Sequence, residues 1–471
     1  MHADVERFSF DPAKRFLRVI EQQGRVMLAA DSNEQAAILV AFLRDLAVDV
    51  IGDFGTPAGP SNNKPGPGFQ VTLDDGRIRI GQGRFWVDGL LCVNDTDLLP
   101  YEDQPDYPAA PKLPTGKVVV YLDLWERHVS SAQDPSIRDV ALGGPDTCTR
   151  SRLVWQVKTA EVRAPGGSAG LTGKGAVDLW RKMWRDQIDG QSRGRMAVEV
   201  ERATGPADPC QVPAGAGYYG NENQLYRVEV HRGSGVLGAN GEELPATFKW
   251  SRDNGSVVYP LSRIEGTVAV LQDPPVDCTK QLTTGTLVEV VDDLTTLLGR
   301  PGVLARVVEV DDDGDDVVIH LSKGPAEAIL PQRHPLLRRW DHPAVEGGPA
   351  GAAAGGGGGG AGPPADPDDD GALKLVEEAD PPLALEDGIV VRFEAGGHRY
   401  RTGDYWTFPA RAAIGDVIWP RDDNGDALAV GPHGIEHHLA PLAVVDAVEG
   451  MVTGAVVDCR VGFPRLATLF A

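Results

Sequence analysis

Long apolar runs and cysteine motifs are what this sequence of 471 residues lacks. No apolar run reaches the ~20 residues that a membrane-spanning helix needs, and the first residues, MHADVERFSFDPAKRF, do not form a charged-then-apolar signal pattern. We therefore predict no membrane insertion and no export by the general route. The cysteines are odd in number and have no Cys-x-x-Cys spacing, which favours reduced thiols: Cys92, Cys148, Cys210, Cys278 and Cys459.

Basic charge is also scarce. Lys and Arg number 45 against 68 Asp and Glu, a formal net charge of −23. Binding of nucleic acid or of an anionic membrane surface needs a clustered basic face, so we expect neither partner. The 57 glycines and 36 prolines interrupt the chain more often than a helical protein tolerates. We predict a mainly β fold: several antiparallel β-sheet, sandwich or barrel-like modules preceded by one amphipathic N-terminal helix.

The predicted helix follows a polar turn in the stretch EQQGRVMLAADSNEQAAI, residues 21–38. Ser32 and Gln35 fit a capping box, in which each side chain bonds to the backbone of the other, and Gly52 is a natural stop. The helix is therefore predicted over residues 33–51. Its apolar residues recur at helical spacing: Ile38, Leu39, Phe42, Leu43, Leu46 and Val50.

This apolar stripe has two equally weighted interpretations. It can cover the first sheet of its own chain, or it can dock on another subunit, because a short helix is marginal without a partner surface. If the stripe is packed, Leu43→Asp is expected to be severely destabilising, since it buries an unpaired carboxylate.

Alternating and β-branched segments predict strands through most of the remaining chain. A hairpin is expected around Asp74-Asp75-Gly76, and a second one within residues 246–261 around Asp253-Asn254-Gly255. Residues 117–129 have the pattern of a central strand, with 151–162 as its pair. Two further predictions are a short helix carrying Trp180 and Trp184, and a strand meander over residues 286–322.

These segments predict five parts along the chain. They are an N-terminal docking segment and helix (1–54), a first β module (55–165), a second β module with an irregular insertion (166–342), a Gly/Pro-rich linker or loop (343–371) and a C-terminal β module (372–471).

Motifs for catalysis and cofactor binding are missing from the sequence. No nucleophile elbow, P-loop or dinucleotide fingerprint occurs. We therefore predict that the protein is not an enzyme, with no catalytic residue and no cofactor.

Three clusters could hold a metal ion, but each favours a structural interpretation. The acidic residues Asp311, Asp312, Asp313, Asp315 and Asp316 surround Gly314 as in a solvated hairpin turn. Asp422, Asn424 and Asp426 alternate as in a calcium loop, but no closing Glu follows. His433, His437 and His438 have no helical H-E-x-x-H order, and a strand would direct the last two to opposite faces. We expect no metal site.

Aromatic residues on alternating strands are more often core residues than sugar-stacking platforms. Trp125 and Trp155 lie in apolar runs and are expected to be buried. Tyr405 and Trp406 are adjacent, so one of them is a candidate for exposure.

Several blocks of the sequence resemble a group of uncharacterised proteins encoded with phage-tail-like contractile injection systems. The opening FDPAKRFLRVIEQQGRVMLAADSNEQAAI looks like the start of that group, although Ser32 replaces a larger residue. Further blocks with this likeness are VYLDLWERHV, DPSIRDVALGGPDTCTR, NQLYRVEVH, TFKWSRDNGSV, RYRTGDYWTFPAR, HGIEHHLAPLA and the closing DCR.

The resemblance implies a non-catalytic structural component of such a particle, baseplate-associated or fibre-like, that is assembled in the cytoplasm and can be released with the particle. Expected partners are other subunits in the baseplate or near the sheath, and further copies of this chain. The predicted partner-binding residues surround the N-terminal turn and helix start: Gln22, Gln23, Gly24, Arg25, Asp31, Asn33, Glu34 and Gln35. The alternative from another class is a carbohydrate-binding or glycan-cleaving appendage.

Overall fold

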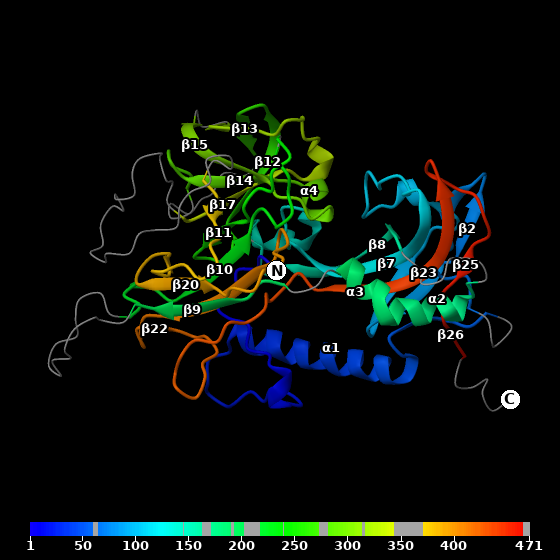
Figure 1. Cartoon of the computed structure of the whole chain (residues 1–471). Helices are drawn as coiled ribbons and strands as arrows, with labels where there is room; N and C mark the ends of the chain where they lie inside the picture. Colours follow the sequence, from blue (N-terminus) through cyan, green and yellow to red (C-terminus); the bar gives the residue numbers. More distant parts are fainter. Residues whose placement is uncertain are drawn as a thin grey trace. The chain divides into compact units, whose positions relative to one another are not determined.

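A computed structural model gives the fold, which is mainly β, as predicted (Figure 1). It describes residues 1–59, 65–144, 146–162, 171–189, 193–201, 217–238, 240–272, 281–312, 316–342 and 371–464. Except for Gly371, the predicted linker lies outside these ranges. The chain forms two compact units: unit 1 comprises Met1–Arg7, His128–Arg150 and Ser192–Ile435, and unit 2 comprises Phe8–Arg127, Ser151–Gln191 and Glu436–Ala471.

Unit 2 contains the N-terminal helix α1 (Ala29–Ile51) and three sheets in its described part. Their strand orders are β26-β1-β4-β5, β2-β3-β6 and β24-β23-β7-β8, with β25 also paired to β23. The strands are β1 (Phe54–Pro57), β2 (Val71–Asp74), β3 (Arg77–Ile80), β4 (Gly83–Val87), β5 (Leu90–Asn94), β6 (Leu99–Pro100), β7 (Gly116–Val129), β8 (Arg150–Glu161), β23 (His437–Val448), β24 (Met451–Val452), β25 (Val457–Asp458) and β26 (Gly462–Phe463).

Strand β7 is central in its sheet, and β8 is its neighbour, so both predictions for these segments are confirmed. Residues Val118–Leu122 are buried because β7 has a strand on either side and covered faces. The predicted short helix is present as α2 (Gly173–Leu179), a π turn (Trp180–Trp184) and α3 (Arg185–Asp189). It covers this sheet: Trp180 and Trp184 are buried, and the Trp180 ring centroid lies 6.0 Å from that of Tyr121.

Unit 1 contains a five-stranded sheet, β18-β11-β10-β21-β22, a three-stranded sheet, β19-β20-β9, and a closed barrel, β12-β13-β16-β15-β14-β17. Its strands are β9 (Met196–Val200), β10 (Gln224–Val230), β11 (Thr247–Ser251), β12 (Val258–Glu265), β13 (Val268–Leu271), β14 (Leu287–Val291), β15 (Val303–Asp312), β16 (Val317–Leu321), β17 (Leu336–Trp340), β18 (Leu373–Lys374), β19 (Leu383–Ala384), β20 (Ile389–Phe393), β21 (Tyr405–Arg411) and β22 (Asp416–Val417). Short helices are α4 (Asp293–Leu297) and the 3₁₀ turns Pro12–Lys14, Tyr101–Asp103, Pro135–Ile137, Val140–Leu142 and Pro331–Arg333, the first two of them in unit 2.

The hairpin predictions have different outcomes. β2 and β3 pair antiparallel across Asp75 and Gly76, whose φ angles of 46° and 72° fit a tight hairpin turn. The prediction of a hairpin around Asp253-Asn254-Gly255 is wrong. Asn254 and Gly255 do adopt positive φ, but β11 pairs with β10 and β18 whereas β12 pairs with β13 and β17. The turn therefore carries the chain from the five-stranded sheet into the barrel.

Two predictions made from the composition, one on the cysteines and one on membrane-spanning helices, can be compared with the described residues. Cys92, Cys148 and Cys459 carry free thiols, and the other two cysteines lie outside the described ranges. Of the helices described, none is both long enough and apolar enough to cross a membrane.

Candidate functional site

Helix α1 begins four residues earlier than predicted. Leu28 is its N-cap and has extended backbone, and no side chain caps the helix. The predicted capping box is therefore wrong, because Ser32 already lies within the helix. Ala29 and Ala30 favour helix, and Asp31 in the first turn complements the helix dipole, which accounts for the earlier start. The predicted stop is confirmed: Gly52 has a φ of 95° and donates its N–H to Val48 O over 2.8 Å.

The inner face of α1 packs against the rest of unit 2. Ala30 and Ile38 are buried, and the Arg44 Nη2 donates to His438 Nε2 over 3.4 Å. The helix passes so close to the turn between β4 and β5 that a Cβ on Gly89 would lie 2.4 Å from the Arg44 carbonyl oxygen. A larger residue at position 89 would push the helix away.

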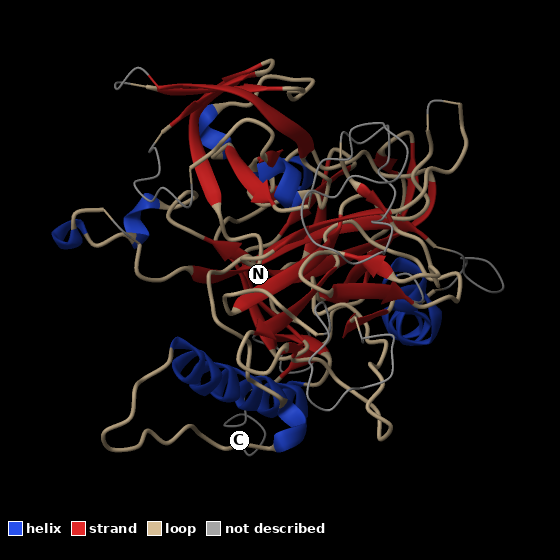
Figure 2. Ribbon diagram, turned by 90° about the vertical axis from the view of Figure 1, so that its left-hand side faces the viewer, coloured by secondary structure: helices blue, strands red, loops and turns tan. Residues whose placement is uncertain are grey.

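The outer face of α1 and the segment before it expose an unusual number of large apolar side chains. We call residues 8–28 the arm, and it runs as a loop beside the long helix in Figures 1 and 2. Besides Phe8 at the start of the arm, eleven large apolar side chains of the arm and of α1 are between 48 % and 84 % exposed. We call this set the apolar face: Phe16, Leu17, Ile20, Val26, Met27, Leu39, Val40, Phe42, Leu43, Leu46 and Val50.

Exposure of such an apolar surface to water is unfavourable in free energy. Soluble proteins rarely leave contiguous apolar patches of this kind uncovered unless a partner binds them. Ile38 faces inward while Leu39 and Leu43 face solvent, so the described part of the chain leaves these two residues of the stripe uncovered.

The predicted partner-binding residues lie on the same two elements as the apolar face. Gln22, Gln23, Gly24, Arg25 and Asn33 are exposed, and Asp31, Glu34 and Gln35 are partly buried. Gln35 has a structural role, since its Oε1 accepts the Val19 N–H over 2.9 Å and holds the arm against the helix. The more exposed apolar residues were missing from the predicted set, although their helical spacing was the signal that could have identified them.

The two aromatic residues that the carbohydrate alternative relied on are both buried. Tyr405 lies beneath the Arg227 guanidinium, 3.6 Å from the ring centroid, and Trp406 Nε1 donates to Val430 O over 2.9 Å. Trp125 is buried as predicted, and Trp155 is half-buried. Tyr405 and Trp406 therefore offer no exposed stacking platform.

The histidines are distributed as their strand pattern predicts. His437 Nδ1 lies 2.8 Å from Asp123 Oδ1, whereas His438 Nδ1 lies 3.0 Å from Asp88 Oδ2. Burial raises the pKa of Asp123, but the hydrogen bond and charge of His437, together with Lys158, lower it overall. Each imidazole thus has its own carboxylate partner. His433 is also engaged, because its Nδ1 accepts the Thr407 N–H over 3.1 Å.

The acidic turn at Asp422 is a backbone turn, as predicted. Asp422 Oδ1 accepts the N–H groups of Asn424 and Asp426 at 2.9 and 2.8 Å. These bonds lower the pKa of the Asp422 carboxyl. The Asp422 carboxylate therefore accepts hydrogen bonds from within its own turn.

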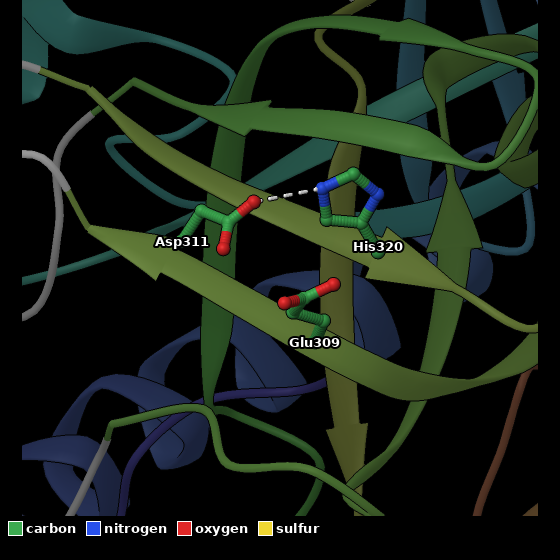
Figure 3. Close-up of side chains that lie close together, drawn as sticks. All are labelled: Glu309, Asp311 and His320. Carbon is green, nitrogen blue, oxygen red and sulfur yellow. Dashed lines mark hydrogen bonds and ion pairs between the residues drawn. The ribbon is translucent and has the colours of Figure 1, made fainter.

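The barrel carries one mixed cluster of possible metal ligands among the described residues (Figure 3). Glu309 and Asp311 lie on β15, and His320 on β16 is the register partner of Glu309. One ligand atom from each lies within 4.8 Å of the others. Asp311 Oδ2 and His320 Nε2 are 3.1 Å apart and pair with each other, and the group is accessible to solvent. Asp313, Gly314 and Asp315 lie outside the described residues.

A buried network of charges in unit 1 was missed by the sequence analysis. Arg227 and Glu229 on β10 are 2.6 Å apart, from Nε to Oε2, and Glu229 Oε1 lies 3.3 Å from Lys249 Nζ on β11. Lys249 also contacts both carboxylate oxygens of Glu289 on β14, at 2.7 and 2.6 Å. The signal was the alternation of charges in LYRVEVH, which resembles an ordinary solvent-facing strand.

The N-terminal residues complete this network. His2 Nε2 lies 2.9 Å from Glu229 Oε2, and Asn254 Nδ2 donates to Ala3 O over 2.9 Å. Burial raises the pKa of Glu229, but the charges of Arg227 and Lys249 bring it well below its ordinary value. Glu229 therefore stays ionised beside Arg227 and Lys249, whereas burial and the charge of Arg227 lower the pKa of His2 well below its ordinary value. This arrangement ties the first residues of the chain to β10 and β11.

Comparison with known proteins adds a family but no activity. The sequence matches a family of unknown function, DUF6519, over residues 1–169 and 189–468. No curated protein and no solved structure matches it. Since the match covers most of both units, the chain belongs to the DUF6519 family of unknown function.

Proposed function

We propose that the protein is a non-catalytic structural component of a phage-tail-like contractile injection system, baseplate-associated or fibre-like. In this proposal the arm and α1 attach it to a neighbouring subunit. The observation that carries the proposal is the apolar face, whose eleven side chains are exposed although the inner face of α1 is anchored.

Two further observations support an assembly role. The charges of the buried network in unit 1 are paired, which suits a rigid structural part. The link to contractile particles itself rests on the sequence blocks that resemble proteins encoded with such systems.

Particle incorporation of single variants tests the proposal. Particles are purified from cells in which Leu43→Asp replaces the wild-type protein, and their subunits are quantified by mass spectrometry. We expect the variant to fold, because Leu43 is 59 % exposed, and to be depleted from the particle.

Val140→Asp is the matched control, since it makes the same kind of change at a residue that is 94 % exposed and far from α1 in sequence. It should be incorporated like the wild type. Absence of the wild-type protein from purified particles would refute the particle assignment, and full incorporation of Leu43→Asp would refute the attachment by α1.

A further inference from the structure

The arm and α1 carry opposite charges. Residues 8–28 contain four basic and two acidic residues, a net charge of +2. Helix α1 contains four acidic residues and one basic residue, a net charge of −3. The basic residues of the arm are Lys14, Arg15, Arg18 and Arg25, and the acidic residues of the helix are Asp31, Glu34, Asp45 and Asp49.

Two charges on each element have no partner among the described residues. In the described ranges, the side chains of Arg15, Arg18, Asp45 and Asp49 make no ion pair or hydrogen bond, and all four are exposed. The arm contacts the helix through a neutral bond instead, from Val19 N–H to Gln35. Both halves of the surface therefore remain available to a partner.

The exposed apolar positions of α1 have the spacing of a helix-packing seam. Leu39, Leu43, Leu46 and Val50 follow one another at intervals of four, three and four residues, and all four are exposed. This is the spacing at which one helix packs along another elongated apolar element. The inward residues Ile38 and Val48 lie on the other side of the helix.

A surface with a basic apolar half and an acidic apolar half is complementary to itself. In a two-fold interface each contact occurs twice, because residue i of one copy meets residue j of the other and the reverse. Two copies placed in this way bring the arm of each against α1 of the other, pair the opposite charges and cover both apolar halves. Residues 8–51 also supply the ~20–30 residues a side that a standard interface uses.

We propose that the subunit covering the apolar face is a second copy of this chain, bound by reciprocal contact of arm and α1. This inference rests on the proposed function, for which it names the partner of the same surface. The acidic net charge of the rest of the chain makes the local charge pairing more important for specificity.

Sedimentation of the purified full chain over a concentration series tests this proposal. We expect the wild type to sediment as a dimer and Leu43→Asp to sediment as a monomer with unchanged circular dichroism. Val140→Asp should remain a dimer.

Charge reversal tests the reciprocal contact itself. Arg15→Glu with Arg18→Glu in the arm, or Asp45→Lys with Asp49→Lys in the helix, should each raise the dimer dissociation constant about tenfold or more. All four changes together should restore dimerisation. A dimer insensitive to both sets would show that another surface forms it.

The outcomes separate this inference from the proposed function. A wild-type monomer at all concentrations, with loss of Leu43→Asp from particles, overturns the second copy as partner but leaves the docking role intact. A dimer broken by Leu43→Asp, with no association of the wild type with particles, supports the self-contact and overturns the particle assignment.

Discussion

Lys249 illustrates, at the scale of single residues, how strongly a buried charge depends on its partner. Its ammonium contacts Glu289 and Glu229 and lies 4.6 Å from the Trp340 ring centroid. Lys249→Met leaves the Glu289 carboxylate buried without the ammonium group that pairs with it. We expect a loss of about 3–5 kcal/mol in the free energy of unfolding, measured by denaturant titration.

Arg79→Met is the matched control. Arg79 pairs with Asp74 over 2.8 Å, but the carboxylate is 67 % exposed. Its removal should cost less than about 1 kcal/mol. Equal small losses for both variants would mean that Lys249 is hydrated and not buried in a fixed pair.

His342 should make unit 1 sensitive to acid. Burial lowers the pKa of His342 from 6.5 to about 4. Between these values the unfolded chain binds a proton that the native chain does not, so stability rises with pH and is lost as the pH falls from 6.5 to 4. The full loss from this one group is about 3 kcal/mol.

His342→Gln should flatten this pH dependence, since glutamine does not titrate and can still donate to Gly371 O, the partner of His342 Nε2 at 2.7 Å. Denaturant titrations across the pH range measure the effect. They can be followed by tryptophan fluorescence, because the Trp250 ring centroid is 6.5 Å from that of His342. An unchanged slope would exclude His342 as a source of the acid sensitivity.

The two faces of α1 should behave differently at the scale of the element. The apolar periodicity left open whether Leu43 is packed. Because Leu43 is 59 % exposed, we expect Leu43→Asp to leave the isolated chain folded. Ile38→Asp should instead lower the melting temperature strongly, because Ile38 is buried and a carboxylate there is unpaired. Thermal unfolding of the two variants side by side gives the comparison, and an equal loss for both would contradict the assignment of inner and outer faces.

The two turn-centred predictions show what local pattern can and cannot decide. β2 and β3 are joined by a two-residue turn, so turn chemistry alone fixes their pairing. Asp253-Asn254-Gly255 has equally good turn chemistry, but Asn254 N–H bonds to Leu225 O and its side chain to Ala3 O. These distant partners turn the chain from one sheet toward the other, and no local signal reports them.

At the scale of the whole molecule, the Gly-rich segment is predicted to be dispensable for folding. Deleting residues 350–362 removes only Gly and Ala, residue types that contribute chain entropy and little side-chain surface. Cooperative unfolding, followed by calorimetry, should persist with a similar transition temperature. A deletion variant without a cooperative transition would show that the segment contributes to the fold.

The sequence by itself determined the β-rich class, the helix that ends at Gly52, and the tight hairpin at Asp75-Gly76, because each depends on neighbours along the chain. Only the tertiary structure decided which side of α1 is buried, which strands β11 and β12 pair with, and that Arg227, Glu229 and Lys249 are internal. These features depend on residues from other parts of the chain, from 40 positions away for Lys249 and Glu289 to 394 for Arg44 and His438. A strand with alternating charges looks the same in sequence whether water or an opposing charge faces it, and the free energy of burial is set by that distant partner.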